Sequence, residues 1–89
     1  MGKKRVAIIG VTGAVGQEFV QSLDNHPWFE VTQIAASERS AGKKYLDAIK
    51  DVSGIIAWDV GGEIPEYIKS MTVKKIDELD VSQLDLVFS

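Results

Sequence analysis

The chain has 89 residues, of which 45% are hydrophobic and 26% charged, and its formal net charge is -3. This balance predicts at most one soluble globular domain with a small core. The acidic charge argues against a nucleic-acid partner, because such proteins usually carry a strongly basic face. No apolar run approaches the roughly 18 residues that span a bilayer, so we expect no membrane partner and a cytoplasmic protein. The absence of cysteine excludes disulfides, thiolate zinc sites and thiol nucleophiles from these residues.

The first half of the chain predicts a strand, a helix and a second strand. The compact apolar run from Val6 to Ile9 is typical of a strand buried on both faces. The helix that follows is expected to bury one face, formed by Val15, Phe19, Val20 and Leu23. Its polar residues fall mostly on the other face, namely Gln17, Glu18, Gln21 and Asp24. Asn25-His26-Pro27 ends the helix, and Val31 to Ala36 is the second strand. Together these elements predict a βαβ unit.

The second half is less sharply patterned. We expect a loop with one helical turn, three further strands and one short helix that begins near Pro65. In chain order these are the loop Ser37 to Lys44, a strand at Ile55 to Trp58 closed by Gly61-Gly62, the helix Glu66 to Met71, a strand at Thr72 to Lys74, and the last strand, Leu84 to Phe88.

The predicted fold is α/β, a Rossmann-like doubly wound, mostly parallel sheet. In such sheets the fourth strand lies on the far side of the first, and the crevice between them is the ligand site. Leu84 to Phe88 is the candidate for that strand, and its apolar residues need helices on both faces. We therefore expect a sheet that is incomplete at the C-terminus, with residues 1–89 forming the N-terminal part of a dinucleotide-binding domain.

Three glycines follow the first strand at a spacing of three. Gly10, Gly13 and Gly16 fit a shifted version of the dinucleotide fingerprint. In it the first glycine makes the turn off the strand, the second lets a pyrophosphate approach the backbone, and the third packs the helix closely on the sheet. The N–H groups of Gly13, Ala14 and Val15 would open the helix as an anion site, and the hydroxyl of Thr12 lies beside them. The alternative is a turn that collects glycine for steric reasons alone.

The end of the second strand bears on which dinucleotide binds. An NAD site usually carries an acid there, whereas this chain reads Ala36-Ser37-Glu38-Arg39-Ser40, followed by Gly42-Lys43-Lys44. Hydroxyls, a guanidinium and two ammonium groups suit the 2'-phosphate of NADP. Glu38 leaves an alternative, because it could hold the ribose and select NAD; we expect it instead to face solvent and balance Arg39. A solvated loop without a ligand is the other interpretation of these cations.

The stretches "GVTGAVGQEFVQSLDNHPWFEV" and "AASERSAGKKY" resemble the N-terminal cofactor segment of aspartate-semialdehyde dehydrogenases, and "IPEYIKSMTVK" with "LDLVFS" resembles the archaeal-type branch. The resemblance implies NADPH-dependent reduction of aspartyl phosphate to the semialdehyde in amino-acid biosynthesis. It implies pyrophosphate contacts from Thr12, Gly13, Ala14 and Val15. It implies 2'-phosphate contacts from Ser37, Arg39 and Ser40, and places Ser89 at the start of the loop on the adenosine side. Malonyl-CoA reductases and acetylglutamyl-phosphate reductases share this fold and chemistry and remain alternatives.

The catalytic groups of that family are not among these residues. Its nucleophilic cysteine and proton-handling histidine lie far downstream, so we expect the catalytic and dimerisation domain to be absent and the segment to be inactive alone. The resemblance also implies a small-molecule substrate and a homo-oligomer at full length. The single histidine, His26, precedes Pro27 in a turn and fits a helix end better than catalysis.

Two other function classes stay open at this point. One is a nucleotide-binding module with no chemistry of its own. The other is a short-chain reductase-like enzyme, which needs a Tyr-x-x-x-Lys pair; Tyr45 and Tyr67 are followed at that spacing by Ile49 and Met71. The acidic residues near the end predict a solvated stretch rather than a metal cluster; they are Asp77, Glu78, Asp80 and Asp85.

Overall fold

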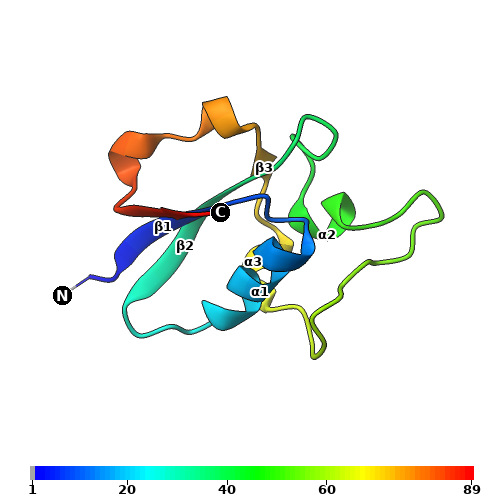
Figure 1. Cartoon of the computed structure of the whole chain (residues 1–89), viewed down its shortest axis with the longest axis horizontal. Helices are drawn as coiled ribbons and strands as arrows, with labels where there is room; N and C mark the ends of the chain where they lie inside the picture. The colour runs from blue at the N-terminus through cyan, green and yellow to red at the C-terminus, as the bar shows by residue number, and fades with distance from the viewer. Residues whose placement is uncertain (1) are drawn as a thin grey trace.

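The computed structural model describes residues 2–89 as one four-stranded sheet with short helices (Figure 1). Its α-helices and strands are β1 (Lys4–Ile9), α1 (Ala14–Ser22), β2 (Phe29–Ala35), α2 (Tyr45–Ala48), α3 (Glu66–Lys69), β3 (Val73–Lys74) and β4 (Leu86–Phe88). Two 3-10 turns, Ile76–Glu78 and Val81–Gln83, connect β3 to β4. The predicted α/β class is confirmed.

The sheet has the strand order β3-β2-β1-β4, and every pairing is parallel. β1 pairs with β2 from Lys4 opposite Phe29 to Ile9 opposite Ala35. On its other side β1 pairs with β4, so that Ile8 lies opposite Phe88. The expected position of the fourth strand beside the first is therefore confirmed. The order reverses direction at β1, and ligands of open α/β sheets bind at such a point, outside the carboxyl ends of the strands.

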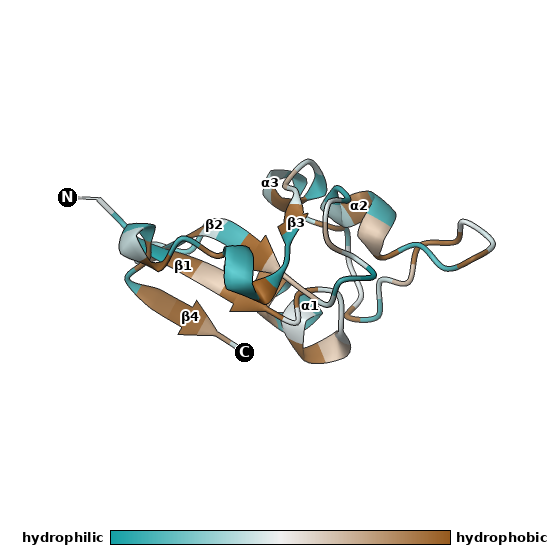
Figure 2. Cartoon of the chain, turned by 90° about the horizontal axis from the view of Figure 1, so that it is seen from above, coloured by the Kyte–Doolittle hydropathy of each residue, from teal (hydrophilic) through white to brown (hydrophobic). Residues whose placement is uncertain are grey.

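The core lies where the sheet meets the helices. β1 and β2 supply most of its fully buried aliphatic residues, and the loops and helices add Val11, Tyr45, Ile49 and Ile68. Figure 2 shows the strands largely in the hydrophobic colour, while the segment after α2 runs out from the body of the molecule in both views. That segment carries exposed apolar side chains, of which Val52 is fully exposed.

Helix α1 is turned differently from its predicted orientation. Val15, expected on the buried face, is 64% exposed, and Gln17, expected on the polar face, is 1% exposed. The close approach of Gly16 to the turn after β1 sets this orientation, and Gln17 is buried because its amide finds backbone partners. Val20 and Leu23 are buried as predicted, and Phe19 packs against the core.

The predicted strand at Ile55 to Trp58 is wrong. Within this segment only an isolated bridge forms, between Lys50 and Ile56. The carboxylate of Asp51 accepts hydrogen bonds from the N–H groups of Ser53 and Ile55, at 2.8 and 3.0 Å, which closes a local turn. Side-chain to backbone bonds of this kind compete with sheet pairing. The β-branched run therefore forms part of an exposed turn.

Other boundaries shift by a few residues. The helix near Pro65 begins at Glu66 as predicted, with Pro65 as its N-cap, and ends at Lys69 rather than Met71. The third strand starts at Val73 and the fourth at Leu86, each later than predicted. The loop after β2 contains the expected helical turn, with Ala41 N–H donating to Ser37 C=O at 3.1 Å.

Candidate functional site

The glycine turn, residues 10–16, leaves β1 at the carboxyl edge of the sheet. Gly10 has a φ of +73°, a left-handed conformation that favours glycine. The N–H groups of Gly10 and Val11 both donate to the carbonyl of Ala35, at 2.9 and 3.2 Å. A Cβ on Gly16 would collide with the carbonyl oxygen of Gly10. The first and third glycines are therefore required by the fold itself.

Gly13 differs from the other two glycines. Its φ of -80° and ψ of 173° suit any residue, and a Cβ built there would meet only Gly10 O, at 3.6 Å. Gly13 is the N-cap of α1 and offers no side-chain cap. The N–H groups of Ala14 and Val15 have no acceptor within residues 2–89. The fold does not require a glycine at position 13. An anion that approaches these N–H groups does require one, because a side chain at this position would stand in its way.

The loop after β2 is anchored beside the glycine turn. Gly42 N–H donates to Val73 C=O at 2.7 Å, and Val73 N–H donates to Lys43 C=O at 2.8 Å, so β3 holds the loop's far end. Ser40 N–H closes a turn onto Ser37 C=O at 3.0 Å. These bonds fix the part of the loop that carries Arg39.

The glycine turn and this loop enclose a cavity of about 270 Å³, which we call the basic pocket. Its lining consists of Thr12, Ser37, Arg39, Ser40, Lys43, Ala48 and Lys50. Three of these seven residues are cationic, three carry hydroxyls and none is acidic. Arg39 and Lys43 form no salt bridge with any carboxylate of residues 2–89. Such a cluster of unneutralised cations indicates an anion site.

Four of the predicted site residues thus meet in one pocket, but two expectations about charged neighbours are wrong. Glu38 does face solvent, yet its nearest cation is Lys75, at 4.0 Å, rather than Arg39. Lys44 turns away from the basic pocket, because its ammonium group donates to Ser70 C=O at 3.4 Å. Ser89 follows Phe88 at the carboxyl end of β4; it is exposed and does not line the basic pocket.

Sequence reasoning missed three residues that build the site. Gln17 donates from Nε2 to Thr12 C=O at 3.0 Å and to Ala57 C=O at 2.8 Å, and its Oε1 accepts from Asp59 N–H at 2.7 Å. Tyr45 donates its hydroxyl to Val11 C=O at 3.0 Å, and burial raises the pKa of Tyr45 above its ordinary value. Lys50 lines the basic pocket. No pattern in the sequence marks Gln17 or Tyr45, because most of their partners lie 34 to 42 residues away along the chain. None marks Lys50 either, because the segments that line the basic pocket meet only in the folded chain.

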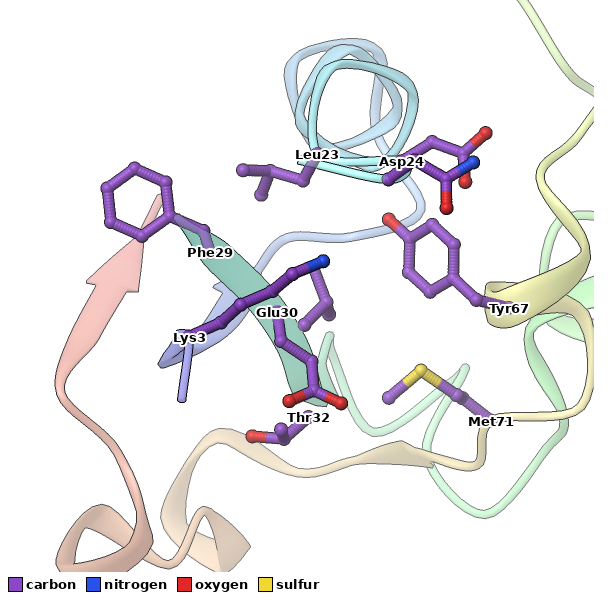
Figure 3. Close-up of a pocket in the computed structure, with 10 residues that line it drawn as sticks. Lys3, Leu23, Asp24, Phe29, Glu30, Thr32, Tyr67 and Met71 are labelled. Atoms are coloured by element: carbon purple, nitrogen blue, oxygen red, sulfur yellow. The ribbon is translucent and has the colours of Figure 1, made fainter. Parts of the chain in front are cut away.

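A larger cavity than the basic pocket lies elsewhere. A hollow of about 550 Å³ at the amino end of β2, which we call the amino-end cavity, is bordered by α1, β2 and α3 (Figure 3). Its lining mixes both charges with apolar groups; Lys3, Asp24, Glu30, Tyr67 and Met71 are among them. The hydroxyl of Tyr67 donates to Val20 C=O at 2.7 Å. Burial, with a smaller contribution from Asp24, raises the pKa of Tyr67 above its ordinary value.

A third cavity, of about 340 Å³, adjoins the basic pocket through Ser37. It is lined by Ala36, Ser37, Glu38, Lys75, Ile76 and Asp77. Within residues 2–89 no cluster of side chains could hold a metal ion, and no helix is both long and apolar enough to cross a membrane. His26 accepts a hydrogen bond from Trp28 N–H at its Nδ1, at 3.1 Å, which fits its predicted role at a helix end.

The model of the semialdehyde dehydrogenase NAD-binding domain matches residues 5–89 of the chain. The chain belongs to this family. The match covers the glycine turn, the loop after β2 and all four strands, apart from Lys4, the first residue of β1. The family resemblance inferred from the stretches quoted in the sequence analysis is therefore confirmed.

Similar proteins come from archaea and fungi. Aspartate-semialdehyde dehydrogenase of Methanothermobacter thermautotrophicus is 43% identical over 84 residues, which are 94% of the chain and 22% of that protein. The Saccharomyces cerevisiae enzyme is 40% identical over 88 residues, 99% of the chain and 22% of its own length. The structure of aspartate semialdehyde dehydrogenase with NADP from Candida albicans superposes with a TM-score of 0.83 at 37% identity, over 99% of the chain and 23% of that protein. The chain thus spans about a fifth of the length of these relatives.

Proposed function

We propose that residues 1–89 form the N-terminal, NADP-binding part of an aspartate-semialdehyde dehydrogenase. The family membership supports a dinucleotide site, and the C. albicans relative was solved with NADP. The observation that carries the choice of NADP is the basic pocket, which joins the glycine turn to the loop after β2. A ribose-binding acid is missing from its lining, and three cations are present.

In this proposal each part of the cofactor lies against residues whose chemistry suits it. The glycine turn would hold the pyrophosphate through the N–H groups of Ala14 and Val15, with Gly13 leaving room and Thr12 adding a hydroxyl. Gly10 and Gly16 shape that turn. The 2'-phosphate would lie against Ser37, Arg39 and Ser40 in the basic pocket. Ser89 would border the adenosine side of the crevice at the end of β4.

NADPH supplies a hydride when it is bound, and in this proposal the substrate is an aspartyl phosphate that is reduced to the semialdehyde. The residues of this chain bind and orient the cofactor. Covalent catalysis needs a nucleophile such as a thiolate, and there is no cysteine among the 89 residues. The catalytic and dimerisation parts, a homo-oligomeric assembly, a cytoplasmic location and a role in amino-acid biosynthesis belong to the same proposal.

The test compares Arg39→Ala with Lys44→Ala in the complete native protein. Both substitutions remove one positive charge from the same loop, but only Arg39 lines the basic pocket. A lost charge-assisted contact of about 1.5 to 3 kcal/mol corresponds to a ten- to hundred-fold weaker affinity for NADPH. We expect this loss for Arg39→Ala, an almost unchanged affinity for NADH, and little effect of Lys44→Ala. Equal losses for NADPH and NADH would remove Arg39 from the 2'-phosphate site.

A further inference from the structure

Lys50 is the third cation of the basic pocket and follows α2 rather than the loop after β2. We propose that Lys50 is a specificity-determining residue, whose ammonium group binds the 2'-phosphate of NADPH together with Arg39. This inference rests on the proposed function. It adds a second charged contact, from a different segment of the chain, to the group that distinguishes NADPH from NADH.

The backbone around Lys50 is held firmly against the glycine turn. Tyr45, at the start of α2, bonds to Val11 C=O through its hydroxyl at 3.0 Å. Ile49, which precedes Lys50, is 4% exposed and accepts a hydrogen bond at its carbonyl from Ala57 N–H at 2.9 Å. The position of Lys50 relative to Thr12 is therefore set by core packing, so little ordering of the backbone is needed when an anion binds.

The charges favour an anion at this point. The ammonium group of Lys50 lies 3.2 Å from a carboxylate oxygen of Asp47, in a pair whose side chains are 39% and 61% exposed. Exposed pairs of this kind contribute about 1 kcal/mol or less. A phosphate dianion between Lys50 and Arg39 carries twice the charge of that carboxylate. It would also relieve the mutual repulsion of the three cations.

The lining of the pocket distinguishes the 2'-phosphate from the pyrophosphate. Lys50 shares the basic pocket with Ser37, Arg39 and Ser40, whereas Gly13, Ala14 and Val15 do not line it. Thr12 is the one residue of the glycine turn among the seven that do. An ammonium group placed here faces the phosphate on the ribose side of the cofactor.

The experiment compares Lys50→Gln with Lys69→Gln in the complete native protein. Lys69 is a matched control, because it forms the same i,i+3 ion pair, with Glu66 at 2.8 Å, and lies outside the basic pocket. We expect Lys50→Gln to weaken NADPH binding about three- to tenfold, to leave NADH binding unchanged and to reduce the salt dependence of NADPH binding. Lys69→Gln should change none of these. Binding of 2',5'-ADP and 5'-AMP, measured by calorimetry, should show the same contrast without any turnover.

The outcomes separate this inference from the proposed function. An unchanged affinity of Lys50→Gln for NADPH, beside a loss in Arg39→Ala, would overturn the role of Lys50 and leave the proposed function standing. Equal losses for NADPH and NADH would assign Lys50 to the pyrophosphate and also overturn the inference. If the unsubstituted protein binds neither NADPH nor 2',5'-ADP, the proposed function and the role of Lys50 both fail.

Discussion

The two ends of the sheet carry different kinds of hollow. The carboxyl end has the smaller basic pocket, about 270 Å³, with three cations and no acid in its lining. The amino end has the larger cavity, about 550 Å³, in which Lys3 lies among Asp24 and Glu30 and the hydroxyl of Tyr67 already has an acceptor (Figure 3). A lining with one cation and two carboxylates, in which the tyrosine hydroxyl already has an acceptor, gives the amino-end cavity little reason to hold an anion.

The difference teaches that volume alone does not locate a nucleotide site. Within residues 2–89 the N–H groups of Ala14 and Val15 have no acceptor, and Arg39 and Lys43 form no salt bridge; these two features mark the carboxyl end. Both features follow from how parallel strands end: every strand delivers its following loop to the same edge. The predictions below test this contrast between the two ends.

The largest effect is expected from a side chain placed in the phosphate's path. Gly13→Val should weaken NADPH binding at least about a hundred-fold, because its side chain fills the space that the backbone leaves open. The fold should survive, since φ at Gly13 is -80° and only Gly10 O lies near the new Cβ. Calorimetric titration with NADPH measures the loss.

Thr32→Leu is the matched control at the other end, since Thr32 lines the amino-end cavity and is exposed. It should leave NADPH affinity unchanged. If NADPH still binds Gly13→Val but no longer binds Thr32→Leu, the cofactor site lies at the amino end of the sheet and not at the carboxyl end.

A smaller effect is expected from substituting Gln17, whose buried side-chain amide supports the glycine turn at the carboxyl end of the sheet. Gln17→Leu removes the three part-buried hydrogen bonds that the side-chain amide forms with the backbone of Thr12, Ala57 and Asp59. A hydrogen bond of this kind contributes about 0.5 to 1.5 kcal/mol net, so losing three should lower the free energy of unfolding by roughly 1.5 to 4.5 kcal/mol. Urea denaturation measures this loss.

Gln33→Leu provides the comparison for that measurement. Gln33 braces a different segment, with Nε2 donating to Asp80 C=O at 3.0 Å and Oε1 accepting from Asp80 N–H at 2.9 Å. We expect it to destabilise the fold while NADPH affinity, measured under folded conditions, stays unchanged. In Gln17→Leu the affinity should fall as well, because Thr12 loses its support. An equal effect of both substitutions on affinity would show that the brace at Gln17 has no special relation to the site.

The smallest effect concerns the amino end of β4. Asp85 accepts a hydrogen bond from Arg5 N–H at 2.8 Å, and this bond, helped by the charges of Arg5 and Lys4, lowers the pKa of Asp85 below its ordinary value of 3.8. A lowered folded pKa adds stability above pH 3.8, and this stability is lost as pH falls through the folded pKa. Asp85→Asn should therefore slightly lower the melting temperature at neutral pH and flatten its decline in acid. An unchanged acid profile would show that Asp85 does not secure β4.

Much of this protein was determined by local sequence. The βαβ order, the turn at Gly10 and the closeness of Thr12 and Arg39 follow from an apolar run, a glycine spacing and a second strand, since parallel strands bring their following loops to one edge. The side of β1 on which β4 lies was also predictable, because doubly wound sheets have a common strand order.

Only the tertiary structure decided which neighbouring side chains complete the site. The sequence pointed to Lys43 and Lys44 as cations of the site and not to Lys50. Because Tyr45 and Ile49 are buried, the backbone at the end of α2 places Lys50 at the basic pocket, whereas Lys44 bonds to Ser70. Gln17 was placed on a polar face by periodicity, yet partners 40 and 42 residues away make its burial favourable. Such long-range hydrogen bonds leave no local pattern, because their free energy arises only when distant segments meet in the folded chain.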